Sequence, residues 1–428
     1  MKVLMFGWEF PPHISGGLGT ACYGLTKGLA YNNVDVALVV PRAYGDEDQS
    51  KVRIVNASDF AFDTRRSRFF QFSKEISYIE VNSRLVPYIG IDDYYNVVNQ
   101  LESGVFDMGE GGDGKRRYQF QGGYGANLMQ EVEKYAVVAE EIAKSETFDV
   151  IHAHDWLTYR AGIAAREVSG KPLVVHIHAT EYDRSGENNR NDIVYNLERE
   201  GMMAADAVCA VSNLTRAIVI EKYGIPAGKV FTLHNAVEPA QRHPGGTRPL
   251  DEKIVTFLGR VTFQKGPEYF VEVAKRVLEK DDNVRFVLAG DGDMMPRVIN
   301  RVAELGIADR FHFTGFLRGK DIDKMFGMSD VYVMPSISEP FGISPLEAMQ
   351  SGVPVIISKQ SGVSEVLQYA IKVDFWDIDA MADAIYGILH YPALAKVFSE
   401  KGLEEANNLK WEDVAARLKK IYEKVVAH

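Results

Sequence analysis

Cysteine is nearly absent from this chain of 428 residues, which contains only Cys22 and Cys209, both within apolar segments. Neither has the spacing of a metal-binding motif, so we expect buried free thiols, no disulfide and no cysteine-bound metal. No apolar run approaches the roughly 18 residues that cross a bilayer, and the N-terminus lacks the apolar core of a signal peptide. We therefore expect a cytoplasmic protein without a membrane span.

Positive charge is also scarce, because 48 Lys and Arg residues stand against 59 Asp and Glu residues, for a net charge of −11. This balance argues against nonspecific binding of nucleic acid. Two basic clusters, RRSRFF (65–70) and KRR (115–117), are local exceptions. They suit solvated surface charge, or contact with a glucan or an anionic lipid head.

Short apolar runs alternate with helical segments along most of the chain, which predicts parallel sheets covered by helices. The alternation stops at a polar segment rich in proline and glycine, 238–253, and then restarts. We therefore predict an α/β protein with two doubly wound Rossmann-like domains, 1–241 and 242–410, facing a cleft. Residues 91–125 lack periodicity and predict a mobile surface insertion. Strands are expected at 3–8, 34–40, 149–154, 173–177, 207–211, 230–233, 254–260, 284–290, 311–316, 331–336 and 354–358.

The most informative stretch is ISEPFGISPLEAM (337–349), which follows an apolar run and contains Glu339 and Glu347. A carboxylate just past the carboxyl end of a buried strand lies where open α/β sheets bind ligands. Ser344 is expected to be the N-cap of a helix, with its first amides directed at the ligand. An alternative is a capping box, in which Glu347 only reaches back to an orphan amide near Ser344.

Two further loops contain groups that suit an anionic ligand. Gly16, Gly17 and Gly19 follow the first strand and precede a helix, although their spacing matches neither the dinucleotide fingerprint nor a Walker loop. This loop suits a phosphate or an ordinary tight turn. Arg260 and Lys265 share one strand-end loop, with no acidic residue between them, which favours binding of a diphosphate over a solvated surface pair.

Histidines end two of the expected strands, in HAHDW (152–156) and HIHATEYDR (176–184). Alternating histidines resemble metal ligands, but no third ligand spacing completes a site, so we expect no metal. A neutral histidine that hydrogen-bonds a sugar hydroxyl is the better use.

Together, GGLG (16–19), HAHDW (152–156), RVTFQKG (260–266) and EPFGISPLEA (339–348) resemble the motifs of retaining glycosyltransferases with the GT-B architecture. The resemblance is to families four and five, which include the bacterial and archaeal glycogen synthases. It implies a nucleotide-sugar donor (UDP- or ADP-glucose), a carbohydrate acceptor such as an α-glucan, no cofactor, and a final helix (411–428) that packs back on the first domain. The acceptor itself is left open.

The resemblance also implies roles for individual residues. Arg260 and Lys265 would hold the donor diphosphate and stabilise its departure. Glu339 would position the donor sugar, and Glu347 would bind the ribose. The other implied contacts are Gly17 and Leu18 at the diphosphate, Phe341, Gly342, Ile343 and His178 at the sugar, Asp155 near the acceptor, and Phe316 and Leu317 at the base.

One motif departs from the family. Family-five synthases carry a Lys-x-Gly-Gly-Leu loop, where this chain has HISGG (13–17), so the resemblance does not choose between UDP- and ADP-glucose. Three functions remain: a transferase that extends an α-glucan, a transferase of the same fold for a lipid, cell-surface glycan or small sugar, and a nucleotide-sugar epimerase or noncatalytic binding subunit. The full set of Arg260, Lys265, Glu339 and Glu347 argues against a noncatalytic subunit.

Overall fold

The computed structural model describes residues 1–13, 16–62, 116–125, 127–186, 189–239 and 251–427. The basic cluster 65–70, most of the predicted insertion and the centre of the predicted linker lie outside these residues. Of the cluster 115–117, Arg116 and Arg117 are described. The chain divides into two compact units, which are described separately below. Unit 1 comprises Met1–Tyr182, Asn189–Asn235 and Trp411–His428, and unit 2 comprises Asp183–Asn188 and Ala236–Lys410.

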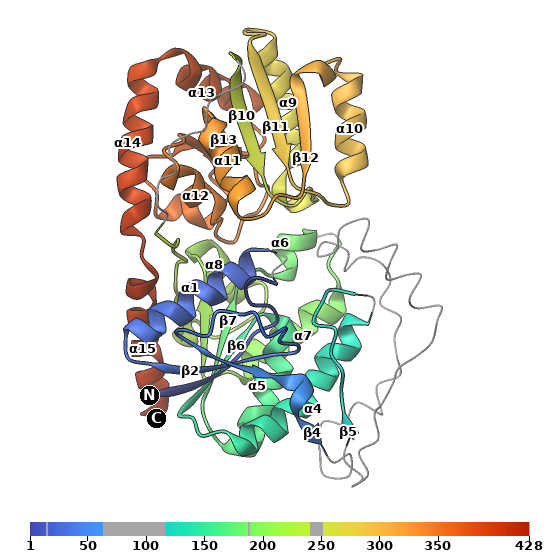
Figure 1. Cartoon of the computed structure of the whole chain (residues 1–428), viewed down its shortest axis with the longest axis vertical. Coiled ribbons are helices and arrows are strands. Elements are labelled where there is room, and N and C mark those ends of the chain that lie inside the picture. The colour runs from blue at the N-terminus through green and yellow to red at the C-terminus, as the bar shows by residue number, and fades with distance from the viewer. Residues whose placement is uncertain (14–15, 63–115, 126, 187–188, 240–250, 428) are drawn as a thin grey trace. The chain divides into compact units, whose positions relative to one another are not determined.

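Unit 1 is built on a parallel sheet of seven strands in the order β3-β2-β1-β6-β7-β8-β9 (Figure 1). The central strands β6, β7 and β8 are buried on both faces, as expected for a parallel sheet covered by helices. Their bounds are β1 Lys2–Phe6, β2 Asp35–Val40, β3 Arg53–Asn56, β6 Val150–His154, β7 Leu173–Ile177, β8 Ala207–Ala210 and β9 Val230–Thr232. A small hairpin pairs β4 (Ala61–Phe62) with β5 (Arg116–Arg117).

The helices of unit 1 pack on this sheet as α1 Gly17–Tyr31, α4 Leu128–Ser145, α5 Trp156–Ser169, α7 Asp192–Ala204, α8 Asn213–Glu221 and α15 Trp411–Val426. The last helix returns to unit 1 from the far end of the chain and lies against α1. Close approach depends on two glycines of α1, because a Cβ at Gly24 or Gly28 would collide with Trp411. Asn32 at the end of α1 also donates a hydrogen bond to the Glu412 carbonyl at 2.9 Å.

Unit 2 contains a parallel sheet of six strands in the order β12-β11-β10-β13-β14-β15. The strands are β10 Lys253–Leu258, β11 Val284–Ala289, β12 Phe311–Gly315, β13 Val331–Met334, β14 Val355–Ser358 and β15 Ile371–Val373. The helices are α9 Pro267–Leu278, α10 Met295–Glu304, α11 Lys320–Met328, α12 Ser344–Gln350, α13 Ile378–His390 and α14 Pro392–Asn408, and short α6 (Glu181–Ser185) begins in unit 1. The predicted fold class, two doubly wound α/β domains, is confirmed.

Each sheet reverses its strand order at one place, between β1 and β6 in unit 1 and between β10 and β13 in unit 2. At such a switch point the loops after the two strands diverge and leave room for a ligand. The glycine-rich loop and the HAHDW motif follow β1 and β6, and the Arg260 and Glu339 loops follow β10 and β13. Among the described helices, none is both long enough and apolar enough to cross a membrane.

Candidate active site

The two loops at the switch point of unit 2 are joined by an ion pair between Lys265 and Glu339. The Lys265 side chain is 19% exposed and that of Glu339 is 7% exposed, so water screens this pair poorly. The Ser336 hydroxyl donates a second hydrogen bond to the Glu339 carboxylate at 3.3 Å. The sequence predicted a role for each residue but not their pairing, because they are 74 positions apart.

Backbone contacts fix the spacing of these two loops. The Ile337 amide donates to the Gln264 carbonyl at 2.9 Å. Gly266 has φ 64°, and a Cβ there would collide with the Pro335 carbonyl, so a residue without a side chain is required. On the far side, the Gly362 amide donates to the Glu339 carbonyl at 2.8 Å. Glu339 therefore lies on a backbone held from both sides.

The helix after Glu339 begins one residue earlier than predicted. Helix α12 starts at Ser344, its N-cap is Ile343, and no side chain caps it. Ser344 is therefore not the N-cap, and the alternative capping box is absent as well. The Tyr332 hydroxyl donates to the Leu258 carbonyl at 3.2 Å, and its pKa is raised mainly by burial and further by the charges of Glu339 and Glu347. Both carboxylates of the stretch thus act on one buried phenol.

Glu347 lies in an environment that disfavours its charged form. Burial, with a smaller effect from Asp323, raises the pKa of this carboxyl to about 7. A carboxyl with this pKa changes charge near neutrality and is ready to accept hydroxyl hydrogen bonds once ionised. The sequence identified Glu347, but its burial and the nearby Asp323 required the structure.

The segment after β12 provides an exposed aromatic surface. Phe316 is 51% exposed, and the Arg318 guanidinium lies over its ring, 5.1 Å from the centroid. A flat apolar ring beside a cation suits stacking with a nucleobase. Leu317 is partly buried next to it. Both residues lie at the carboxyl edge of the sheet, beyond β11 and away from the ion pair.

A third loop of unit 2, residues 290–294, follows β11 and was not predicted from the sequence. The Val261 amide donates to the Asp291 carbonyl at 2.8 Å, and the Met294 amide donates to the Val261 carbonyl at 3.0 Å. A Cβ at Gly290 would collide with the carbonyl of Gly259. Burial raises the pKa of Asp293 and the charge of Arg260 lowers it, so these two side chains lie close together. The glycines in AGDGD (289–293) were the signal for this contact.

In unit 1, the predicted phosphate-binding loop contains a carboxylate that the sequence did not mark. The Gly19 amide, near the start of α1, donates to the buried Glu9 carboxylate at 3.1 Å. Gly17 is exposed and Leu18 is partly buried, so the first turn still has surface available. Burial raises the pKa of Cys22, and so do the charges of Asp155 and Glu9, which places both acids near this turn.

Asp155 has a strained backbone, with φ 57° and ψ 170° at the N-cap of α5. This region is rare for residues other than glycine and is found mainly at functional sites. Hydrogen bonds hold it there, because the Asp155 amide donates to the His176 carbonyl at 2.9 Å. The Asp155 carboxylate accepts from the His178 amide at 2.6 Å. Asp155 therefore fixes the start of the segment that follows β7.

His178 is held against a second histidine, with its Nε2 atom 2.9 Å from Nδ1 of His154. Burial lowers the pKa of His178 to about 3, so the imidazole is neutral at pH 7. A neutral ring accepts at one nitrogen and donates at the other. The neutral form of His178 agrees with the sequence analysis, and its contact with a sugar hydroxyl stays a prediction.

The histidines of β6 and β7 form one cluster, which the sequence did not predict. These strands are neighbours, and His154 is paired in register with His176. His152, His154 and His176 are at most 1% exposed, and each offers a nitrogen within 4.8 Å of the others. Cys22, His154 and His178 form a second group of this kind. The two groups share His154, and only the first consists of three histidines.

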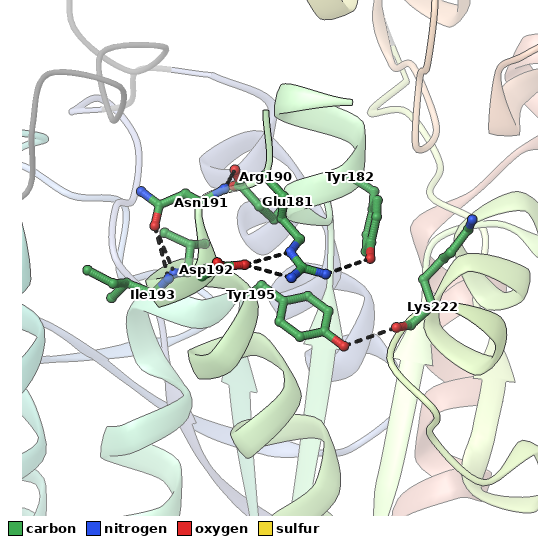
Figure 2. A network of polar contacts seen from close by, with 9 residues as sticks. Glu181, Tyr182, Arg190, Asn191, Asp192, Ile193, Tyr195 and Lys222 are labelled. Carbon is green, nitrogen blue, oxygen red and sulfur yellow. Dashed lines mark hydrogen bonds and ion pairs between the residues drawn. The ribbon is translucent and has the colours of Figure 1, made fainter. Parts of the chain in front are cut away.

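A polar network fixes the chain where α6 and α7 meet in unit 1 (Figure 2). The Arg190 guanidinium donates to Asp192 at 2.6 Å and to the Tyr182 hydroxyl at 2.9 Å, and it lies 4.1 Å from the centre of the Tyr195 ring. The Asn191 side chain caps α7 through the Ile193 amide at 3.0 Å. These contacts anchor the segment after His178, and nothing in the spacing of the sequence indicated them.

Two parallel α/β units with polar loops gathered at their switch points define the fold class, and the chain belongs to the GT-B glycosyltransferases. Within this class, residues 2–232 match the family described as starch synthase catalytic domain, and residues 241–405 match glycosyl transferases group 1. The resemblance inferred from the motifs is therefore confirmed.

Individual proteins agree with this assignment. An uncharacterized glycosyltransferase of Methanocaldococcus jannaschii is 28% identical, covering 99% of this chain and 98% of the relative. The glycogen synthase of Mycobacterium tuberculosis is 24% identical, covering 99% of this chain and 94% of the relative. The solved sucrose-phosphate synthase of Thermosynechococcus elongatus has the same fold, with a TM-score of 0.73 at 19% identity over 100% of this chain and 99% of that one.

Proposed function

We propose that this glycosyltransferase moves a glucosyl unit from UDP- or ADP-glucose to an α-glucan and retains the configuration at the anomeric carbon. The observation that carries the proposal is the poorly solvated Lys265–Glu339 pair, which lies with Arg260 at the switch point of unit 2. Fixed positive charge at this edge of the sheet suits the leaving diphosphate. The glucan acceptor is inferred from the likeness to starch and glycogen synthases.

In this proposal Arg260 and Lys265 bind the diphosphate and stabilise the charge that develops as it leaves. Glu339 orients the Lys265 ammonium and binds sugar hydroxyls beside the Phe341, Gly342 and Ile343 backbone. Ionised Glu347 accepts the ribose hydroxyls, and Phe316 and Leu317 contact the base. Because these donors are preorganised by backbone contacts, little reorganisation is needed during the reaction.

The residues of unit 1 complete the proposal on the acceptor side. Neutral His178 hydrogen-bonds the donor sugar, Asp155 lies near the acceptor, and Gly17 and Leu18 offer amides to the diphosphate. Retention arises from front-side displacement, in which the departing phosphate takes the proton of the acceptor hydroxyl. The step requires neither a covalent sugar on Glu339 nor a catalytic metal or cofactor.

The decisive experiment incubates the full chain with UDP-glucose or ADP-glucose labelled in the sugar, with and without glycogen. We expect label in glycogen with one donor preferred, and NMR of the first product should show an α-linkage. Label transferred only to a membrane extract or a small sugar would replace the glucan acceptor by another. Trapping of a glucosyl ester on Glu339 would overturn front-side displacement.

A further inference from the structure

The buried histidine cluster of unit 1 contains polar atoms that have no hydrogen-bond partner among the described residues. They are Nε2 of His152, Nε2 of His154 and both ring nitrogens of His176. A neutral imidazole buried without a partner for its N–H group loses the free energy of its hydration. Several such groups together require an explanation, and an ion or a water molecule is the usual one.

The strand pattern directs these rings away from the main apolar core. The intervening residues Ile151 and Ala153 belong to the core on the other face of the sheet, so the histidines point toward the face that contacts α1 and α15. Cys22 of α1 and Tyr422 of α15 lie beside them. The histidine nitrogens are therefore enclosed by buried elements and have no access to bulk water.

In two of the three imidazoles, one ring nitrogen has a partner of the kind that orients histidines in metal sites. His152 hydrogen-bonds the Tyr422 hydroxyl through Nδ1, and His154 contacts His178 through Nδ1. In both rings this leaves Nε2 available. Metal-binding histidines usually engage their other ring nitrogen in this way, which fixes the tautomer and the orientation of the ring.

We propose that His152, His154 and His176 bind one divalent cation, with zinc as the best match, and that the cation joins β6 to β7. Three neutral imidazoles suit zinc among the borderline metals, with water as the fourth ligand. The proposed site lies on buried strands, and binding of the cation does not depend on the proposed sugar transfer.

The geometry sets one requirement for binding. The rings of His152 and His154 are stacked, with centroids 4.4 Å apart and planes 18° apart. In a tetrahedral site with Zn–N bonds of about 2.1 Å, the nitrogens lie roughly 3.4 Å from one another. The rings must therefore turn about χ2, a soft torsion for histidine, to direct their lone pairs to one point.

The test measures metal content in the full chain, purified without a histidine tag. We expect about one zinc ion per chain by mass spectrometry of the metal, and less than about a tenth of this in His176→Gln. Protein refolded with Co²⁺ should show the visible absorption of tetrahedral cobalt. His312→Gln, at an exposed histidine of unit 2, is the matched control and should keep its zinc.

If His176→Gln does not fold, a milder variant still tests the proposal. Tyr422→Phe removes only the hydroxyl that contacts His152 and should weaken zinc binding by about 10- to 100-fold. The proposal is overturned if the purified chain contains no metal and refolding with Zn²⁺ or Co²⁺ changes neither its metal content nor its melting temperature. A crystal structure with water bonded to these nitrogens would overturn it as well.

Discussion

Lys265 and Glu339 depend on each other, because removal of either leaves a poorly solvated charge without its partner. Breaking such a pair costs about 3–5 kcal/mol, whereas replacing both charges costs much less. Loss of activity in a single variant therefore combines two effects, on stability and on the reaction. The two effects separate when the pair is removed as a unit.

We predict that Lys265→Met lowers both stability and turnover, with turnover falling about 100-fold, because the diphosphate loses a fixed cation. The double variant Lys265→Met/Glu339→Gln should recover most of the stability in urea but none of the turnover. Lys280→Met is a matched control, because this lysine pairs with Asp383 at an exposed site and should have little effect on either quantity. Full turnover in the double variant would show that the reaction does not require the ion pair.

Arg260 provides the second test of the diphosphate contact. Arg260→Ala should lower turnover by about 100-fold, measured at saturating donor with glycogen as acceptor. Arg276→Ala, at an exposed arginine on α9, is the control and should retain normal turnover. Equal rates for the two variants would show that Arg260 does not act on the leaving group.

Glu347 makes the protein sensitive to pH near neutrality. Its pKa is about 7 in the folded chain against an ordinary value of 4.5, so the folded chain favours the protonated carboxyl. Its stabilising contribution is therefore full below pH 4.5 and is lost as the pH rises through about 7. Glu347→Gln stays neutral, so its stability relative to the wild type should rise between about pH 4.5 and about pH 7 and stay constant above that range.

The same carboxyl predicts the pH dependence of donor binding. Ribose hydroxyls bind best to the ionised form, so the KM for the nucleotide sugar should fall from about pH 6 to about pH 8. In Glu347→Gln the KM should be higher and nearly independent of pH. Steady-state kinetics across this range checks both, and a constant wild-type KM would contradict the assignment to ribose.

Asp155 predicts a difference between two variants that both lack the carboxylate. Asp155→Gly relieves the strain at φ 57°, whereas Asp155→Ala keeps it, so the glycine variant should be more stable by about 1–2 kcal/mol in urea unfolding. Both should lose activity, because the His178 amide loses its acceptor. Equal stability of the two variants would show that this backbone conformation is not strained.

At the residue scale, the sequence indicated the positions of candidate side chains but not their partners. Glu339, Lys265 and Asp155 were identified because each follows a buried strand. Their contacts depend on which strands become neighbours, which local spacing does not determine. For the same reason, the sequence suggested two separate histidine pairs, whereas adjacent β6 and β7 bring them together.

At the scale of elements, the predicted strands agree closely with the observed ones, because buried parallel strands are short apolar runs. Helix α12 begins one residue earlier than predicted, and no side chain caps it. The position of α15 against α1 had no signal in local patterning and was expected only from the resemblance.

Two glycine-to-alanine substitutions should have opposite effects on stability, because only the first lies in the contact between α1 and α15. Gly28→Ala should destabilise the protein by about 1–3 kcal/mol, because the Cβ meets the Trp411 backbone, which has little room to move. Gly387→Ala, in the interior of α13, should stabilise it by about 0.5–1 kcal/mol, because the Cβ meets only Leu394 at 3.8 Å. Thermal unfolding of both variants checks this, and a neutral Gly28→Ala would show that the helices can separate.

At the scale of the whole molecule, the two units share one type of sheet topology. Both sheets are parallel, and both place their polar loops at the one point where the strand order reverses. This repetition follows from topology, because no shared residue pattern connects the two halves of the sequence. An apolar periodicity was therefore enough to predict the fold class, while the chemistry had to be found loop by loop.

Helix α15 has a consequence for how the protein is made. Trp411, Leu418 and Tyr422 are buried in unit 1, yet they are synthesised after unit 2. Unit 1 therefore remains incomplete, with the α15 side of α1 uncovered, until residues 411–426 have been synthesised. A chaperone that shields this surface on the nascent chain would assist folding. A premature stop codon near residue 410 would give a chain in which unit 1 lacks α15.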